Sequence, residues 1–400
     1  MIHIDNYNFK GKRVIIRVDF NVPLDKDYNI TDDSRIRASI PTIEKVLNDG
    51  GCAVIMSHMG RPKEKGEEKY SLIHIVDHLA GLLKTDVKFA GDCIGELVAE
   101  KVNSLKPGEV ILIENLRYYK EETKGDRDFA RELASLGDVF VNDAFAAVHR
   151  AHASTTVIAD FFPQDKMFGY LLERELKSID KVINDIQRPY LAIIGGAKVS
   201  SKIGVLNNLI DKVDDLIIGG GMMFTFIKSK GGEVGDSIVE KDYLSEAREI
   251  VSYANSKGVN IHLPVDTVVA NKFSNDAVIK TCDSYQIPNN WIGMDIGEKA
   301  ARNFSSLIES SKNVLWNGPM GVAEMPKFAS GTKTILKAMA KATEKGAFTL
   351  AGGGDSVAVI NKFEMADKVS YVSTGGGALL EYMEGKELPG IKAIVKSNNR

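Results

Sequence analysis

The fold is decided by the stretch Leu191-Ala192-Ile193-Ile194-Gly195-Gly196-Ala197-Lys198 of this sequence. Four consecutive apolar residues followed by two glycines predict a strand that is buried on both faces and ends at a tight turn. Strands buried on both faces are typical of a parallel sheet covered by helices. Glycine also lets backbone N–H groups approach an anion closely, so the turn is a candidate phosphate site.

Apolar runs of the same kind recur along the chain, with longer amphipathic stretches between them. They cover residues 14–18, 53–56, 110–113, 139–141, 216–218, 314–316, 348–351 and 369–372. This alternation predicts an α/β fold of doubly wound, Rossmann-like parallel sheets. The 400 residues are enough for two such domains at about 150 residues each.

The stretch 170–187 predicts an unusually regular amphipathic helix, because its apolar residues alternate at spacings of four and three. They are Leu172, Leu176, Ile179, Ile183 and Ile186, and Arg188-Pro189 ends the pattern. The helix either joins two domains or packs on the core of one of them, and the sequence leaves these alternatives about even.

Composition excludes several classes of protein. The formal net charge of −3 favours neither nucleic acid nor an anionic membrane as the main partner. Only three cysteines occur, Cys52, Cys93 and Cys282, without a CxxC pair, so structural zinc and a disulfide framework are not expected. The N-terminal residues lack the pattern of a secretory signal, and no apolar stretch is long enough for a membrane span. We expect a cytoplasmic protein.

Glycine triplets occur only in the second half, each after an apolar run. They are Gly219-Gly220-Gly221, Gly352-Gly353-Gly354 and Gly375-Gly376-Gly377. One triplet alone is as easily an ordinary turn, but three at strand ends favour phosphate-binding loops. Neither the P-loop motif nor a dinucleotide fingerprint after a strand is present.

Charged residues beside these glycines support the same interpretation. Lys198 and Lys202 would share one face if a helix begins after Gly196, and would then point to the anion-binding end of that helix, although a solvated face is the commoner role of such a pair. Asp355 is either the cap of a following helix or a ligand of Mg²⁺ at a polyphosphate site. We favour the metal role.

The first half is rich in polar and basic residues at the ends of the predicted strands. These residues are Asp19, Asn21, Arg35, His58, Arg61, Arg117, His149, Arg150 and His152. Several arginines in loops indicate a carboxylate or phosphate ligand, although each arginine alone is more often a surface ion pair. His74 and His78 do not form a zinc-protease motif, because no glutamate follows His74.

Eight ordered motifs resemble the phosphoglycerate kinase family. They begin at Arg17-Val18-Asp19-Phe20-Asn21, Ser57-His58-Met59-Gly60-Arg61, Glu114-Asn115-Leu116-Arg117, Asn142-Asp143, His149-Arg150-Ala151-His152, Gly195-Gly196-Ala197-Lys198, Trp316-Asn317-Gly318-Pro319 and Gly352-Gly353-Gly354-Asp355. The resemblance extends from near residue 13 to Leu388-Pro389-Gly390, which is nearly the whole chain.

The resemblance implies reversible phosphoryl transfer from 1,3-bisphosphoglycerate to MgADP, which gives 3-phosphoglycerate and MgATP. It assigns the phosphoglycerate to Asp19, Phe20, Asn21, Arg35, His58, Met59, Gly60, Arg61, Arg117 and Arg150. It assigns the nucleotide to Lys198, Lys202, Gly219, Gly220, Gly293, Asn317, Glu324, Gly353, Gly354, Asp355 and Ser356, with Asp355 on Mg²⁺. Catalytic roles are implied for Arg35, Lys198, Gly375 and Gly376.

The same resemblance implies a monomer of two domains that close around the substrates. The expected phosphoglycerate domain contains residues 1–169 and 388–400, the hinge helix residues 170–187, and the nucleotide domain residues 188–387. Two positions depart from the usual pattern: Met59 replaces a leucine and Ala323 a phenylalanine. The second change removes a large side chain beside Glu324, so that part of the nucleotide pocket is expected to depart from the usual shape.

Two rival interpretations are weaker. A nicotinamide-dependent dehydrogenase would also use α/β domains, but the dinucleotide fingerprint is missing. A catalytically silent anion-binding protein is disfavoured because Arg35, Lys202 and Asp355 are all present.

Overall fold

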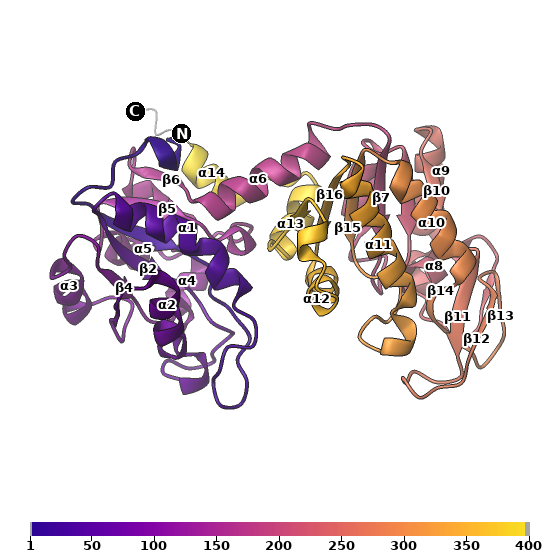
Figure 1. Cartoon of the computed structure of the whole chain (residues 1–400), viewed down its shortest axis with the longest axis horizontal. Coiled ribbons are helices and arrows are strands. Elements are labelled where there is room, and N and C mark those ends of the chain that lie inside the picture. The colour runs from indigo at the N-terminus through magenta and orange to yellow at the C-terminus, as the bar shows by residue number, and fades with distance from the viewer. Residues whose placement is uncertain (1, 397–400) are drawn as a thin grey trace. The chain divides into compact units, whose positions relative to one another are not determined.

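The computed structural model describes residues 2–396, and the chain divides into two compact units (Figure 1). The first unit contains Met1–Leu176 and Glu387–Arg400, and the second contains Lys177–Lys386. Each unit is built on a six-stranded parallel sheet, so the predicted α/β class with two parallel sheets is confirmed.

The sheet of the first unit has the strand order β3-β4-β2-β1-β5-β6. Its strands are β1 (Arg13–Arg17), β2 (Cys52–Met56), β3 (Val87–Phe89), β4 (Val110–Leu112), β5 (Val139–Asn142) and β6 (Lys166–Phe168). All five residues of β2 are buried, as a strand covered on both faces requires.

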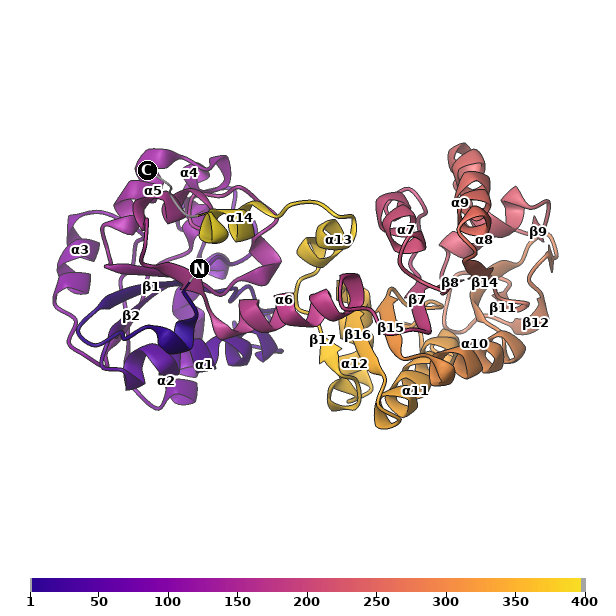
Figure 2. The ribbon, with the colours of Figure 1, turned by 90° about the horizontal axis from the view of Figure 1, so that it is seen from above.

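Helices cover both faces of this sheet (Figure 2). The helices α1 (Ser34–Asn48) and α2 (Val76–Leu83) lie on one face, while α5 (Arg127–Ala134) lies on the other. Shorter helices α3 (Glu96–Asn103) and α4 (Lys120–Lys124) complete the set. The helix α14 (Pro389–Val395) contacts β6, so the end of the described chain packs on the first unit.

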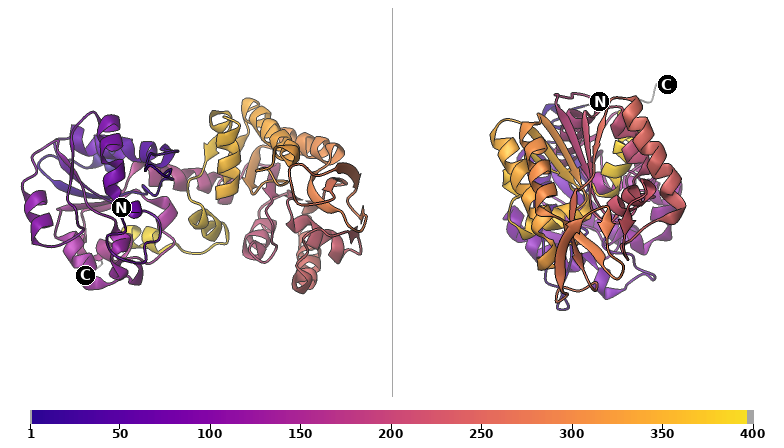
Figure 3. Two further views of the ribbon diagram at one scale, coloured as in Figure 1. Left: turned by 90° about the horizontal axis from the view of Figure 1, so that it is seen from below. Right: turned by 90° about the vertical axis from the view of Figure 1, so that its right-hand side faces the viewer.

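The sheet of the second unit has the order β10-β8-β7-β15-β16-β17. Its strands are β7 (Tyr190–Ile194), β8 (Asp215–Ile218), β10 (Asn260–His262), β15 (Asn313–Asn317), β16 (Phe348–Gly352) and β17 (Tyr371–Val372). Its helices are α7 (Ile203–Ile210), α8 (Met222–Ser229), α9 (Leu244–Ser256), α10 (Glu298–Ser310), α11 (Ser330–Glu344), α12 (Gly354–Lys362) and α13 (Gly377–Met383). Figure 3 shows helices on both sides of this sheet.

A small antiparallel sheet in the second unit was not predicted. It has the order β12-β11-β14, with β11 (Asp266–Ala270), β12 (Ile279–Asp283) and β14 (Ile292–Ile296). Beside it, β9 (Glu233–Val234) pairs with β13 (Gln286–Ile287). The residues of β12 are mostly exposed, so this sheet lacks the continuous apolar run by which a buried parallel strand is recognised.

The predicted helix over 170–187 is α6 (Tyr170–Ile183), which ends four residues early in the structure. The N–H groups of Asn184 and Asp185 both donate to the carbonyl of Asp180, which closes its last turn. The division between the two units falls within α6. None of the helices in residues 2–396 is both long and apolar enough to cross a bilayer.

Candidate functional site

The carboxyl ends of four strands meet at one edge of the first unit's sheet. Arg17, the last residue of β1, is in register with Met56 of β2 and Asn142 of β5, and Ile55 is in register with Leu112 of β4. The loops that follow these strands therefore lie side by side. This parallel register explains why polar residues far apart in the sequence form one cluster.

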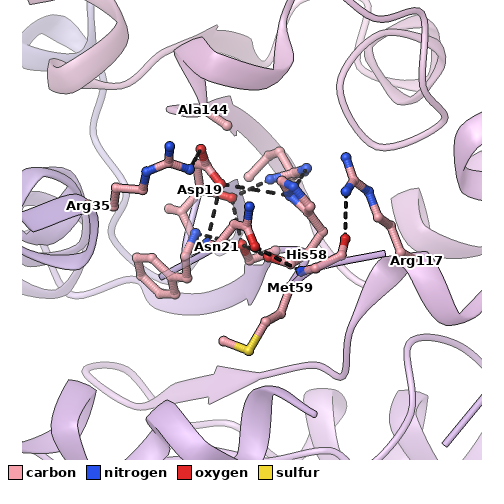
Figure 4. Close-up of polar contacts among 12 residues, drawn as sticks. Asp19, Asn21, Arg35, His58, Met59, Arg117 and Ala144 are labelled. Carbon is pink, nitrogen blue, oxygen red and sulfur yellow. Dashed lines mark hydrogen bonds and ion pairs between the residues drawn. The ribbon is translucent and has the colours of Figure 1, made fainter. Parts of the chain in front are cut away.

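Hydrogen bonds connect the predicted residues of this cluster (Figure 4). Asp19 Oδ2 accepts from Arg35 Nη1 at 2.7 Å. Asn21 Oδ1 accepts from the N–H of Gly60 at 2.8 Å, and Arg117 Nη1 donates to the carbonyl of Gly60 at 2.6 Å. Gly60 thus ties the loops after β1, β2 and β4 together.

Arg61, Arg117, Arg150 and His152 line a cavity of 680 Å³ in the first unit. Burial, together with the nearby charges of Arg150 and Arg17, lowers the pKa of Arg117 to about 10. Burial, together with the charges of Arg17, Arg117 and Arg150, lowers the pKa of His152 to about 4. The ring of His152 is therefore neutral at pH 7. Glu64 and Glu121 also line the cavity, but the basic side chains outnumber them, so the cavity has a net positive charge and fits a phosphate or carboxylate.

Two predicted residues of this site turn their side chains away from it. Phe20 and Met59 are buried in the apolar core of the first unit. Asn115 explains how the Met59 loop keeps its shape: its side chain accepts from the N–H of Met59 at 3.2 Å and donates to the Met59 carbonyl at 2.8 Å. Contacts between Met59 and a ligand would therefore use its backbone.

Three buried residues behind the cluster were not given a role in the sequence analysis. Arg17, Glu122 and Ser154 form a hydrogen-bonded group beside His58. Arg17 and Ser154 lie within quoted motifs, but Glu122 belongs to a highly charged stretch that reads as an exposed helix. No sequence signal distinguishes the buried Glu122 from Glu121.

The second unit places predicted nucleotide residues at the carboxyl edge of its sheet. Asn317, the last residue of β15, is in register with Ile194 of β7 and Gly352 of β16. Its Oδ1 accepts a hydrogen bond from Lys202 Nζ, and within residues 2–396 its buried Nδ2 has no partner. Burial lowers the pKa of Lys202 to about 8, although the nearby Asp355 opposes the shift.

The condition under which Lys198 and Lys202 would share a helix face, a helix that begins after Gly196 and contains both, is not met. The helix α7 begins at Ile203, and Lys202 occupies its N-cap position. The N–H and hydroxyl of Ser200 donate to the carboxylate of Glu240 at 3.0 and 2.6 Å, which holds the preceding segment as a loop. As a result, Lys198 is exposed while Lys202 is buried, and the two do not share a helix face.

The loop glycines of this unit pack against one another. A Cβ on Gly220, which has a φ of +62°, would lie 2.5 Å from the nitrogen of Gly196. A Cβ on Gly195 would meet the carbonyl oxygens of Gly318 and Pro319, and one on Gly219 would meet Met320. Backbone packing between the loops therefore requires these glycines with or without a ligand.

The turn after β16 opens a helix, as predicted. The helix α12 begins at Gly354 and carries Asp355, an exposed carboxylate, in its first turn. Ser356 is buried and its Oγ accepts from the N–H of Gly318 at 2.7 Å. The helix α13 begins at Gly377, just after Gly375 and Gly376.

Gly293 and Glu324, the remaining predicted nucleotide residues, lie on β14 and after β15. The ring of Phe224 occupies the space that a Cβ on Gly293 would take. Glu324 is exposed, and Ala323 before it is buried. The carbonyl of Ala323 accepts from Lys362 Nζ at 3.1 Å, which ties this loop to α12.

Comparison with known proteins decides the family. The family model described as phosphoglycerate kinase matches residues 4–386. The chain belongs to the phosphoglycerate kinase family. A phosphoglycerate kinase of Porphyromonas gingivalis is 52% identical over 415 residues and covers 98% of this chain and 99% of its own. A cytosolic phosphoglycerate kinase of Nicotiana tabacum is 49% identical over 387 residues, or 97% of this chain and 96% of its own.

Solved structures of phosphoglycerate kinases match the fold. The enzyme from Coxiella burnetii has a TM-score of 0.88 at 38% identity and covers 98% of both chains. That from Pyrococcus horikoshii has a TM-score of 0.86 at 31% identity and covers 99% of this chain and 98% of its own. As a phosphoglycerate kinase by family, the chain is a transferase of glycolysis.

Proposed function

We propose that the protein transfers a phosphoryl group reversibly between 1,3-bisphosphoglycerate and MgADP to give 3-phosphoglycerate and MgATP. Membership of the family supports this reaction. The observation that carries the assignment of substrate is the cavity lined by Arg61, Arg117 and Arg150, because a small acid with a phosphate and a carboxylate would offset its net positive charge.

The first unit holds the phosphoglycerate in this proposal. Arg61, Arg117 and Arg150 take its phosphate or carboxylate. The loop of Asp19 and Asn21 adjoins them, because Asn21 accepts from the N–H of Gly60, next to Arg61. Arg35 stabilises the negative charge that spreads over the transferred phosphoryl group. The position of Arg35 supports this role. Asp19 holds the guanidinium group, and 37% of the Arg35 side chain is still exposed, so the group can contact a ligand.

The second unit holds the nucleotide. The ammonium group of Lys202 and the unpaired Nδ2 of Asn317 are donors that a phosphate oxygen would satisfy. Gly353, Gly354 and Ser356 supply the N-terminal turn of α12 on the same edge. Gly219, Gly220, Gly293 and Glu324 bound the proposed nucleoside pocket, while Lys198, Gly375 and Gly376 act on the transferred group.

Asp355 is the proposed protein ligand of Mg²⁺. Among the described residues no group of three or more carboxylate, histidine or cysteine side chains is arranged to hold a metal by itself. A single exposed carboxylate at a helix start fits Mg²⁺ that arrives with a nucleotide, since this ion commonly keeps waters and phosphate oxygens as its other ligands. When bound, the ion would neutralise charge on the phosphates.

The reaction needs positioning and charge stabilisation rather than a general base. The accepting carboxylate is already ionised at pH 7, and a loose phosphoryl transition state is stabilised by cations and N–H donors. The substrates must also meet in a site from which water is excluded, because water would hydrolyse the acyl phosphate. We infer that residues 170–187 act as the hinge between a domain of residues 1–169 plus 388–400 and one of residues 188–387.

We further propose that the enzyme works as a monomer in the cytoplasm, with 1,3-bisphosphoglycerate or 3-phosphoglycerate and ADP or ATP as its only obligatory partners. The modest net charge of −3 supports the exclusion of nucleic acid and membrane surfaces. Sedimentation of the purified chain would test the oligomeric state.

A coupled assay tests the reaction directly. Consumption of ATP is measured with 3-phosphoglycerate present and absent, and with Mg²⁺ present and removed by a chelator. The proposal requires ATP consumption that depends on both 3-phosphoglycerate and Mg²⁺. Absence of turnover together with NADH binding would favour the dehydrogenase alternative instead.

A further inference from the structure

The cluster behind the phosphoglycerate site contains two charged groups that are almost fully removed from water. Arg17, at the end of β1, is 1% exposed, and Glu122, in α4, is 0% exposed. Burying an unpaired charge costs several kcal/mol or more, so both groups need partners inside the protein. Arg17 Nη1 donates to the Val18 carbonyl, and one hydroxyl group is a partner of both charges.

Ser154 is the bridge between the two charges. Its Oγ accepts from Arg17 Nε at 2.9 Å and donates to Glu122 Oε1 at 2.6 Å. Its backbone N–H donates to Glu122 Oε2 at 3.0 Å. Burial raises the pKa of Glu122, but Arg17 and the hydrogen bonds from Ser154 oppose the shift. Both carboxylate oxygens are acceptors, which is the arrangement of an ionised glutamate. The hydroxyl proton consequently points to Glu122 and its lone pair to Arg17.

The other end of Arg17 determines the protonation of His58. Arg17 Nη2 lies 3.2 Å from His58 Nδ1. A guanidinium group can only donate, so Nδ1 must be the acceptor and the ring proton must lie on Nε2. Burial and the charges of Arg17, Arg117 and Arg35 hold the pKa of His58 well below its usual range. The ring is therefore neutral, and its 3.8 Å approach to Asp19 is no ion pair.

We propose that Glu122 and Ser154 are positioning residues that act through Arg17 to fix His58 as the neutral tautomer with its proton on Nε2. None of the hydrogen bonds among residues 2–396 uses Nε2 of His58. In this tautomer Nε2 offers a donor to an oxygen of the substrate. In the other tautomer the same atom would carry a lone pair that repels an anionic oxygen. The second part of the inference, contact with substrate, rests on the proposed function.

Ser154→Ala is the most direct test, because it removes the bridge and keeps all the charges. Arg17 Nε then loses its acceptor, and the guanidinium keeps only its contacts with the Val18 carbonyl and His58, so its hold on Nδ1 weakens. Ser71→Ala is a matched control, since Ser71 Oγ also donates to a buried glutamate, Glu114, at 2.6 Å in the same unit. Both variants lose one hydroxyl–carboxylate hydrogen bond, but only the first touches Arg17.

The first measurement is the tautomer itself, read from nitrogen chemical shifts of ¹⁵N-histidine in the full chain without ligand. The His58 signals are assigned by comparison with His58→Gln. We expect an unprotonated Nδ1 and a protonated Nε2 in the parent and in Ser71→Ala, and a mixture in Ser154→Ala. A protonated Nδ1 in the parent, or an unchanged tautomer in Ser154→Ala, would overturn the inference whether or not the chain has kinase activity.

The second measurement separates positioning from general loss of stability. In the kinase assay, Ser154→Ala should raise the KM for 3-phosphoglycerate about tenfold and leave the KM for ATP unchanged, while Ser71→Ala changes neither. Ser154→Thr keeps the hydroxyl and should recover most of the affinity. Equal effects of Ser154→Ala and Ser71→Ala on the KM for 3-phosphoglycerate would show that the cluster stabilises the fold and does not position His58. If Ser154→Ala does not fold, Arg17→Lys replaces it in both measurements. Lysine keeps the positive charge but lacks the planar guanidinium group that contacts Ser154 and His58 together. The same tautomer and KM results are then expected.

Discussion

Arg35 Nη1 donates to Asp19 Oδ2 at 2.7 Å, so a carboxylate after β1 holds in place a guanidinium group from the first turn of α1. Asp19 is nearly buried, with 8% of its side chain exposed, whereas Arg35 keeps 37%. The pair therefore fixes the direction of the arginine and leaves its charge accessible. Such an arrangement suits a group that acts mainly in a transition state.

Arg35→Ala should lower kcat by about 10³-fold, the lower range for an arginine that stabilises phosphoryl transfer. It should change the Kd for MgADP less than threefold, because Arg35 belongs to the other unit's proposed site. Arg37→Ala is the control, since Arg37 pairs with Asp33 on the exposed side of the same helix. Turnover that survives unchanged would remove Arg35 from the mechanism.

Lys202→Ala should weaken MgADP binding about 10- to 100-fold, the range expected for one charge-assisted hydrogen bond in a buried site. The loss also leaves Oδ1 of Asn317 without its donor. Titration calorimetry measures the change, and Lys228→Ala, on an exposed face of α8, is the control. Normal affinity in Lys202→Ala would contradict the proposed nucleotide site.

Gly220→Ala should destabilise the second unit more than Gly231→Ala. Both glycines have positive φ, +62° and +88°, which costs an alanine about 1–2 kcal/mol. A Cβ at Gly231 meets nothing within 4 Å, but a Cβ at Gly220 would lie 2.5 Å from Gly196. Urea unfolding gives the free energy of unfolding of each variant. The difference between the two values measures the cost of separating the loops, which we expect to be about 1–3 kcal/mol. Equal losses would show that the loops move apart freely.

Asp143 should make the protein less stable as the pH rises from about 4 to 6. Burial raises the pKa of Asp143 to about 6, an effect only partly offset by hydrogen bonds from Thr42 and from the N–H groups of Leu171 and Leu172. The folded state thus binds this proton more tightly than the unfolded state, where the pKa is about 3.9. The stabilisation is complete below about pH 4 and lost above about pH 6.

Asp143→Asn removes this titration and should gain stability relative to the parent between pH 4 and 8. About two pKa units at about 1.4 kcal/mol each set an upper limit of about 3 kcal/mol. Urea unfolding at several pH values measures the difference, and Asp128→Asn, an exposed carboxylate of α5, is the control. A difference from the parent that stays constant with pH would show that Asp143 does not titrate in this range.

Much of the fold followed from short-range patterns. Runs such as Leu191-Ala192-Ile193-Ile194 are buried on both faces in the structure, because a strand in a covered parallel sheet has apolar surroundings on either side. The edge strands β3, β6 and β10 and the antiparallel sheet around β11 were missed. The three edge strands have three residues each and β12 is mostly exposed, and their pairing depends on neighbours that a local pattern does not contain.

The sequence by itself determined the strand ends, the two classes of loop and the family resemblance, because these depend on residue type and order. Tertiary structure alone decided that Lys202 is buried while Lys198 is not, since the ammonium group of Lys202 donates to Asn317, 115 residues away. It also decided that Glu122 is a buried ion rather than a surface charge. Burial and hydrogen-bond direction are set by residues far away in the chain, and for that reason the proton on His58 could be located only in the folded protein.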